Sequence, residues 1–135
     1  MTEAKQEIKI GDEVGDGTIL AGFYEGKPLY TTSRDAPLSY SFNEAQGRAE
    51  FNNKRGNFGH KDWRVPTKDE LNVLFENRNE GALKGTFNET GSNTAGWYWS
   101  SSPSTNFTNW GQNFSNGEMY DFSRGSDMSL RCVRG

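Results

Sequence analysis

The stretch Gly96-Trp97-Tyr98-Trp99-Ser100-Ser101-Ser102 decides how this chain folds, together with Leu130-Arg131-Cys132-Val133-Arg134 near its end. Both segments have the apolar and aromatic density of buried strands. Residues 103–129 between them are poor in aliphatic side chains, lack lysine, and place Phe107, Trp110, Phe114, Tyr120 and Phe122 among Ser, Asn and Gly. Aromatic side chains give contact area at low entropic cost, and Ser, Gly and Asn adapt their hydrogen bonds. This composition is typical of a displayed recognition surface.

The composition of the whole chain favours one folded domain with an aromatic core. Of its 135 residues, 32% are hydrophobic and 13% aromatic, and the net charge is −3. This charge is too small for charge-driven disorder, and the length allows one modest core. No stripe of Lys and Arg is available for a phosphate backbone, so we expect no nucleic-acid partner. No apolar run reaches membrane-spanning length, so we expect no membrane insertion.

The single cysteine and single histidine limit the chemistry that the chain can carry. Cys132 alone forms no intrachain disulfide, and we expect it to be a small buried side chain in a strand. His60 is predicted to lie in a loop. We therefore predict no catalytic residues and no cofactor. Scattered acids leave open a structural calcium ion, held by Glu118, Asp121 and Asp127 with backbone carbonyls.

The N-terminal part of the chain predicts a hairpin after a flexible lead over residues 1–10. Turn residues over 11–17 precede a strand-like run over 18–24. The turn Glu25-Gly26-Lys27 then leads into a second strand over 28–32, which makes a β-hairpin. The N-terminus has no apolar signal-peptide core. The location of the protein stays open between the cytoplasm, a virion and a cell surface reached by another route.

Two helices are predicted after the hairpin, and each begins with a capping box. Ser41 pairs with Glu44 in the first box, and Thr67 pairs with Glu70 in the second. The apolar stripes predicted to face the core are Phe42, Ala45 and Ala49 in the first helix and Leu71, Leu74 and Phe75 in the second. Gly56 and Gly81 are expected to end the two helices.

A single domain over residues 11–135 follows from this order, with the hairpin over 11–40, the helices over 41–81 and a strand-and-loop half over 82–135. Alternation in 97–102 predicts a strand with one face buried through Trp97 and Trp99. In the last strand, Leu130 and Cys132 are predicted on the face opposite to Arg131 and Val133. The fold class is α+β, with a small antiparallel sheet and long irregular loops.

Three separated motifs resemble one known family. They are Asp62-Trp63-Arg64-Val65-Pro66-Thr67 with Glu70-Leu71, Trp97–Ser102, and Leu130–Arg134. Over roughly residues 40–134, the chain resembles the family that includes the C-terminal domain of bacterial collagen-like adhesins. The resemblance implies a C-type-lectin-like fold, related to retroelement-diversified variable proteins and formylglycine-generating enzymes. A collagen-like stalk, the cysteine pair of those enzymes and the Glu-Pro-Asn or Gln-Pro-Asp motif of calcium-dependent lectins do not occur in this sequence.

By analogy with the variable proteins, residues 103–129 are expected to form the display region. We expect Trp63, Trp97 and Trp99 to be core residues, and Arg64 and Arg131 to be structural. Arg124 is predicted to be the arginine with the most freedom to bind an anion. The predicted ligand-binding residues are Asn106, Thr108, Asn109, Trp110, Gln112, Asn113, Asn116, Glu118, Tyr120, Asp121, Ser123, Arg124 and Asp127.

The function expected from these features is non-enzymatic recognition of a protein or glycan ligand. The domain would serve phage or bacterial adhesion, or belong to the retroelement-diversified proteins. One alternative is a structural or assembly protein of a homo-oligomer, for which the analogy favours a trimer. The other is a metal-assisted enzyme, whose chemistry would rest on the acids Asp62, Glu70, Glu118, Asp121 and Asp127, because fold alone does not fix function.

Overall fold

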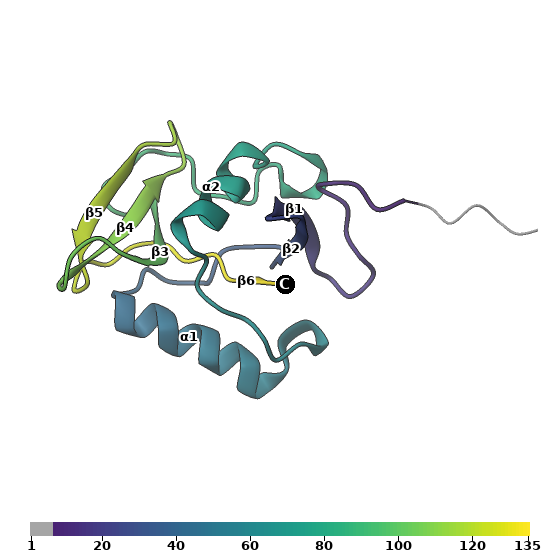
Figure 1. The fold of residues 1–135 in the computed structure, drawn as a ribbon, viewed down its shortest axis with the longest axis horizontal. Coiled ribbons are helices and arrows are strands. Elements are labelled where there is room, and N and C mark those ends of the chain that lie inside the picture. The colour runs from purple at the N-terminus through teal and green to yellow at the C-terminus, as the bar shows by residue number, and fades with distance from the viewer. Residues whose placement is uncertain (1–6) are drawn as a thin grey trace, which may run out of the picture.

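Two helices and two three-stranded antiparallel sheets make up the computed structural model, which describes residues 7–135 (Figure 1). One sheet has the order β1-β2-β6 and the other the order β3-β4-β5. The strands are β1 (Ile19–Tyr24), β2 (Lys27–Thr31), β3 (Trp97–Pro103), β4 (Thr108–Asn113), β5 (Met119–Ser123) and β6 (Val133–Arg134). The helices are α1 (Phe42–Arg55) and α2 (Lys68–Glu76), with short 3-10 turns η1 (Asn57–Gly59) and η2 (Gly81–Leu83). The predicted α+β class is confirmed.

The predicted N-terminal hairpin is formed by β1 and β2. Glu25 and Gly26 turn the chain with positive φ angles of 51° and 78°, the geometry that joins two twisted strands with the fewest residues. The last strand, β6, pairs with β2 through Thr31 opposite Val133. The C-terminus therefore lies beside the first hairpin (Figure 1).

Both predicted capping boxes are present. The side chain of Ser41 accepts a hydrogen bond from the Glu44 amide, and Thr67 accepts one from the Glu70 amide. Gly56 ends α1 in the left-handed conformation, as predicted. The prediction that Gly81 ends α2 is wrong, because α2 stops at Glu76.

The early end of α2 is fixed by a contact with the first sheet. The Asn77 side chain, just after the helix, donates a 2.9 Å hydrogen bond to the Ala21 carbonyl in β1. Gly81 instead begins η2, where its backbone meets that of Gly11 so closely that a Cβ would lie 2.6 Å from the Gly11 oxygen.

No helix in residues 7–135 is long and apolar enough to cross a membrane.

The core consists of two clusters, one on each side of β3. One cluster, on the α1 side, contains Trp63, Trp97 and Trp99 with Leu130 and Cys132. The other, on the α2 side, is built from Leu71, Leu74, Tyr98, Phe114 and Val133 with neighbouring residues. The three tryptophans are thus core residues, as expected, and Leu130 and Cys132 face away from Val133, as predicted.

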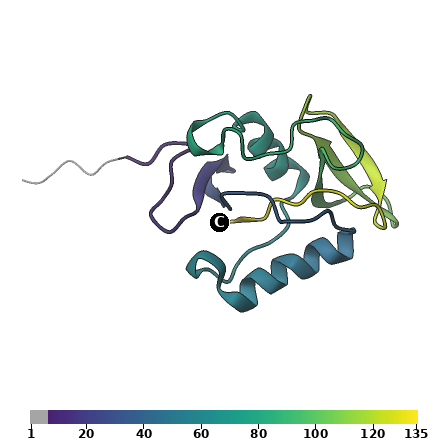
Figure 2. The same ribbon diagram turned by 180° about the vertical axis from the view of Figure 1, so that it is seen from behind.

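The prediction that β3 buries only its tryptophan face is wrong. Trp97, Tyr98, Trp99 and Ser100 are all buried. The reason is that the α1-side cluster covers one face of these four residues and the α2-side cluster covers the other. Figure 2 shows α1 running below the β3-β4-β5 sheet. The residues of the two clusters place α1 against one face of β3 and α2 against the other.

Arg131 joins the last segment to the interior with a fully buried side chain. Its Nε donates to the Asp35 carboxylate at 3.0 Å, and its other nitrogens donate to the Thr32 and Thr86 carbonyls at 3.1 and 2.6 Å. The guanidinium also stacks on the Phe87 ring at 3.9 Å. Arg131 is therefore structural, as expected for a buried group that must find acceptors.

Candidate functional site

The strand register of the β3-β4-β5 sheet decides which predicted site residues share a surface. Gly111 in β4 lies opposite Trp99 and Tyr120, whereas Trp110 lies opposite Asp121. Because side chains alternate between the faces of a strand, Trp110 and Asp121 share one face and Tyr120 lies on the other. The face with Trp110 is the one that α2 covers in part. The face with Tyr120 is the one that packs toward the α1-side cluster.

This register divides the predicted display region. Trp110 and Tyr120, both predicted to bind the same ligand, lie on opposite faces of the sheet. Tyr120 and Phe122 pack against Trp97, with ring centroids 5.6 and 5.0 Å apart. A single contiguous patch that contains both Trp110 and Tyr120 is therefore not formed.

The open end of the α2-side face carries a compact group of side chains, which we call the Trp110 ledge. It consists of Lys68, Ser104, Thr108, Trp110 and Asp121. The Lys68 amine lies 5.2 Å from the centre of the half-buried Trp110 ring, within the range of a cation–π contact. The Asp121 carboxylate accepts hydrogen bonds from the hydroxyls of Thr108 and Ser104 at 3.3 and 3.4 Å.

Lys68 belongs to the ledge although it lies outside residues 103–129. It is the first residue of α2, and its amide donates a 2.9 Å hydrogen bond to the Ser102 hydroxyl of β3. The helix start thus docks on the sheet and brings an amine to a surface whose own sequence has no lysine. The capping box at Thr67 indicates the helix start, but nothing in the sequence indicates that this start lies beside Ser102 and Trp110.

Three of the predicted ligand-binding residues have buried side chains and do not contribute to the surface. Asn109 donates to the Ser100 carbonyl at 3.2 Å. Gln112 donates to the Asn72 side chain at 2.8 Å, and Asn113 accepts from the Ser115 amide and hydroxyl at 2.8 Å. The Asn109 amide thus links β4 to β3, the Gln112 amide links β4 to α2, and Asn113 holds the turn after β4.

Several other predicted residues lie on exposed loops or at a strand end. These are Asn106 before β4, Asn116 and Glu118 between β4 and β5, Ser123 at the end of β5, and Asp127 after it. The structure brings none of them into the Trp110 ledge. The aromatic side chain most exposed near them is Phe107, at 77%.

The prediction that Arg124 has the most freedom to bind an anion is wrong. Its Nε donates to the Asn109 side chain at 2.6 Å, and its terminal nitrogens donate to the Asn106 and Thr105 carbonyls. The guanidinium therefore fastens the loop between β3 and β4 to the end of β5. No sequence pattern marks this role, because the three acceptors belong to β4 and the loop that precedes it, about 15 to 19 residues away in the chain.

The acids proposed for metal or catalytic chemistry do not gather at one place. The Glu70 carboxylate forms a two-point pair with the Arg64 guanidinium, and Asp62 accepts from Arg134 at 2.7 Å. Burial opposes ionisation of Glu70, but hydrogen bonds from Arg64 and Thr67 outweigh it and hold its pKa below the usual value. In the described part of the chain, no group of three or more His, Cys, Asp and Glu side chains is arranged to hold a metal ion.

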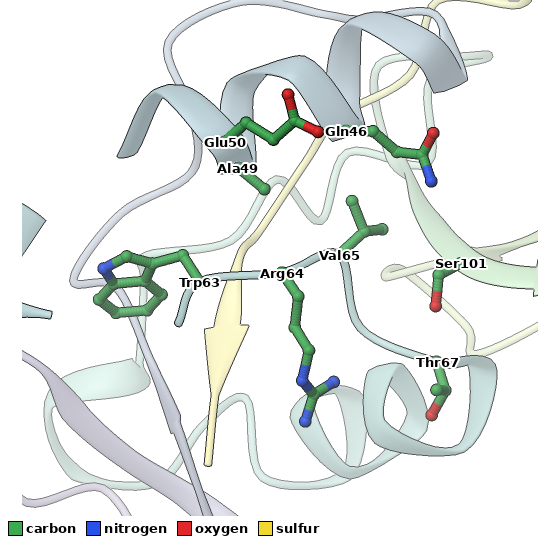
Figure 3. Close-up of a pocket in the computed structure, with 8 residues that line it drawn as sticks. All are labelled: Gln46, Ala49, Glu50, Trp63, Arg64, Val65, Thr67 and Ser101. Carbon is green, nitrogen blue, oxygen red and sulfur yellow. The ribbon is translucent and has the colours of Figure 1, made fainter. Parts of the chain in front are cut away.

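A cleft of about 320 Å³ opens between α1 and the extended segment that carries Trp63 and Val65. Figure 3 shows Ala49 and Val65 on its two sides, with Gln46 and Glu50 above and Arg64 turned away toward α2. Thr67 and Ser101 line the end of the cleft that approaches the start of α2. Its lining combines apolar side chains with polar ones, and no sequence pattern indicated the cleft.

Comparison with known families gives one match. The sequence model of the Lcl C-terminal domain matches residues 25–134. This range includes the ledge, the cleft, the whole α1-side cluster and all of the α2-side cluster except Ile19 and Ala21. No curated protein matches the chain.

Proposed function

The chain belongs to the Lcl C-terminal domain family, of C-type-lectin-like and variable-protein type, and on this premise we propose that it is a non-enzymatic domain that binds a protein or glycan through the Trp110 ledge. The family match supports the coarser statement of a ligand-binding, adhesin-like domain. The choice of surface rests on the geometry of the sheet.

The observation that carries this proposal is the meeting of Trp110, Lys68 and Asp121 from three different elements. An indole ring offers apolar contact area, the amine donates hydrogen bonds, and the carboxylate accepts them. The hydroxyls of Thr108 and Ser104 add groups that do both. A few polar groups around one aromatic anchor are the composition that both sugar hydroxyls and a protein hot spot require.

The surroundings of the serines and acids support a non-enzymatic role. The Ser100 hydroxyl donates to the Trp110 carbonyl at 2.6 Å, and the Ser102 hydroxyl accepts from the Lys68 amide. A nucleophilic serine needs a base within hydrogen-bond reach, and these hydroxyls contact backbone groups instead. Glu70 and Asp62 are held in ion pairs with arginines.

The test is binding to a glycan array and to bacterial and host cell surfaces, with variants on the two faces of the sheet. Trp110→Ala and Asp121→Ala should each weaken binding about tenfold or more, the usual cost of truncating an interface anchor. Tyr120→Ala is the matched control, because it removes an exposed aromatic side chain from the opposite face of the same sheet. Loss of binding in Tyr120→Ala with retention in Trp110→Ala would contradict the proposal, as would a wild-type protein that binds none of these surfaces.

The finer proposal is a retroelement-diversified adhesion protein of a phage or bacterium. Its test is the DNA around the coding region, which should contain a template repeat that differs from the gene only at adenines. The substituted codons should include those of Thr108, Trp110 and Asp121 and spare those of the buried Asn109 and Gln112. Substitutions confined to the buried positions, or an absent repeat, would contradict it.

A homo-oligomer is the second candidate, favoured by the exposed side chains on and beside the other face of the sheet. Tyr120 is 55% exposed and Phe107 is 77% exposed, and exposed aromatic side chains are typical of interface anchors. Light scattering after size exclusion should give the mass of a trimer for the wild type and of a monomer for Tyr120→Ser with Phe107→Ser. A monomeric wild type would contradict it.

A further inference from the structure

A second cavity, on a different side of α1 from the cleft of Figure 3, has a strongly cationic lining. It measures about 620 Å³ and lies between α1 and the segment 32–37 that leaves β2. Both ribbon views show this segment running along α1 (Figures 1 and 2). A volume of this size is within the range of small-molecule sites.

The lining of this cavity comes from one stripe of α1 and the facing loop. Arg48, Asn52 and Arg55 are spaced four and three residues apart, so they lie on one face of the helix. Arg34 contributes from the segment 32–37, and Asn57 and Phe58 close the end of the cavity at η1. We call these three arginines with Asn52 the arginine pocket.

The charges of the arginine pocket have no counter-charge in the described structure. Within residues 7–135, neither Arg34, Arg48 nor Arg55 takes part in an ion pair. Asp35 is the one acid in the lining, and its carboxylate is occupied by Arg131 and the Tyr98 hydroxyl. Three positive charges thus line one cavity of a chain whose net charge is −3, with Arg48 half-buried and Arg34 and Arg55 exposed.

Arg48 adds an unmet hydrogen-bond donor. Its Nε is buried and has no partner within the described residues. Its guanidinium lies 4.8 Å from the centre of the Phe51 ring, and that of Arg55 lies 5.2 Å from the same ring. Stacking on one ring fixes both guanidinium groups without using their N–H groups, so these donors remain available. A buried donor without an acceptor is costly, which is the condition that a bound anion relieves.

We propose that the arginine pocket binds a small molecule through a phosphate group. Arginine pairs with two oxygens of a phosphate at once, and a dianionic phosphate matches several guanidinium charges better than one carboxylate does. The Asn52 amide is not the phosphate ligand that we propose, because it already donates to the Cys132 sulfur at 3.8 Å. The remaining volume leaves room for the body that carries the phosphate. This site is separate from the Trp110 ledge and does not depend on the function proposed for it.

Isothermal titration calorimetry with glucose 6-phosphate, inorganic phosphate and glucose tests this site. We expect both phosphates to bind the wild-type protein at millimolar concentrations or below, and glucose not to bind. Arg48→Gln and Arg55→Gln should each weaken phosphate binding about tenfold, the effect expected for loss of a charge-assisted hydrogen bond. Tighter binding of the ester than of inorganic phosphate would show that the cavity also contacts the carrier.

Lys54→Gln is the matched control, since it removes one positive charge from the same helix at an exposed position outside the cavity lining. It should change the affinity by less than about twofold at physiological salt, because an amine outside the cavity makes no contact with the phosphate and its longer-range charge is screened. Thermal unfolding gives a second readout. Phosphate should raise the Tm of the wild type and of Lys54→Gln, and it should raise the Tm of Arg48→Gln much less. Equal affinities in Arg48→Gln and Lys54→Gln, equal binding of glucose and its phosphate, or no binding of either phosphate would overturn the proposal.

Discussion

Replacement of Asp35 by Asn should be among the most destabilising isosteric changes in this domain. Asp35 is the counter-ion of Arg131, whose side chain is completely buried, and its own side chain is 22% exposed. The change keeps the shape of the side chain but leaves the guanidinium charge without a partner in the interior. Removing one partner of a buried ion pair costs about 3–5 kcal/mol. Because Asp35 is partly exposed, we expect the loss in free energy of unfolding to lie near the lower end of this range, at about 3 kcal/mol.

This cost is large compared with the whole stability of a domain, which is usually about 5–15 kcal/mol. For a chain of this length, it corresponds to a fall in Tm of roughly 10 °C. Urea denaturation followed by circular dichroism measures the free energy of unfolding directly. The matched control is Asp62→Asn, which breaks the Asp62–Arg134 pair, where the Asp62 side chain is 56% exposed. An exposed pair of this kind should cost less than about 1 kcal/mol.

A double-mutant cycle with Arg131→Met completes the test. Met can still cover the Phe87 ring, on which the guanidinium stacks at 3.9 Å, but it leaves the Thr32 and Thr86 carbonyls without donors. The double variant should be less destabilised than the sum of the single variants, with a coupling of about 1–3 kcal/mol. An Asp35→Asn variant that loses no more stability than Asp62→Asn, or a cycle without coupling, would refute the reasoning.

Three further predictions concern a thiol, a carboxylate and a glycine. Burial raises the pKa of the Cys132 thiol to about 12, so at pH 8 Ellman's reagent should label the folded protein more than about a hundredfold more slowly than the unfolded protein; comparable rates would contradict this. The pKa of Glu70 is held low despite burial by its pair with Arg64, so its stabilisation is present above the unfolded pKa of about 4.3 and lost as the pH falls. Glu70→Gln should therefore make the free energy of unfolding, measured with urea, depend less on pH in that acid range. An unchanged pH dependence would refute this reasoning. Gly47→Ala, in an open position of α1, should raise stability by about 0.5–1 kcal/mol in the same assay, whereas a loss would show a hidden constraint.

The two proposed sites use different parts of the fold. The Trp110 ledge depends on the register of β4 with β5, and the arginine pocket depends on one stripe of α1 and the loop that faces it. Neither site includes a residue of the other. A variant that abolishes phosphate binding is therefore expected to retain binding at the ledge, which allows the two functions to be measured independently.

The sequence by itself determined the local structure of this protein. The capping boxes at Ser41 and Thr67, the hairpin turn at Glu25 and the left-handed end of α1 at Gly56 all depend on residues within a few positions of one another. Their hydrogen bonds form within one turn of chain, so neighbouring residue types are enough to predict them. The core role of the tryptophans followed in the same way from their position in dense aromatic segments.

Only the tertiary structure decided which side chains share a surface. The sequence presents Trp110 and Tyr120 as equivalent aromatic residues, and the pairing of Gly111 with Tyr120 places them on opposite faces. Docking of α2 brings Lys68 to Trp110, and a loop contact consumes the donors of Arg124. The physical reason is that a shift of strand register by one residue exchanges the two faces of a strand. What each face then contacts depends on segments far apart in the chain: Phe122 packs on Trp97 on one face, and Gln112 donates to Asn72 of α2 on the other.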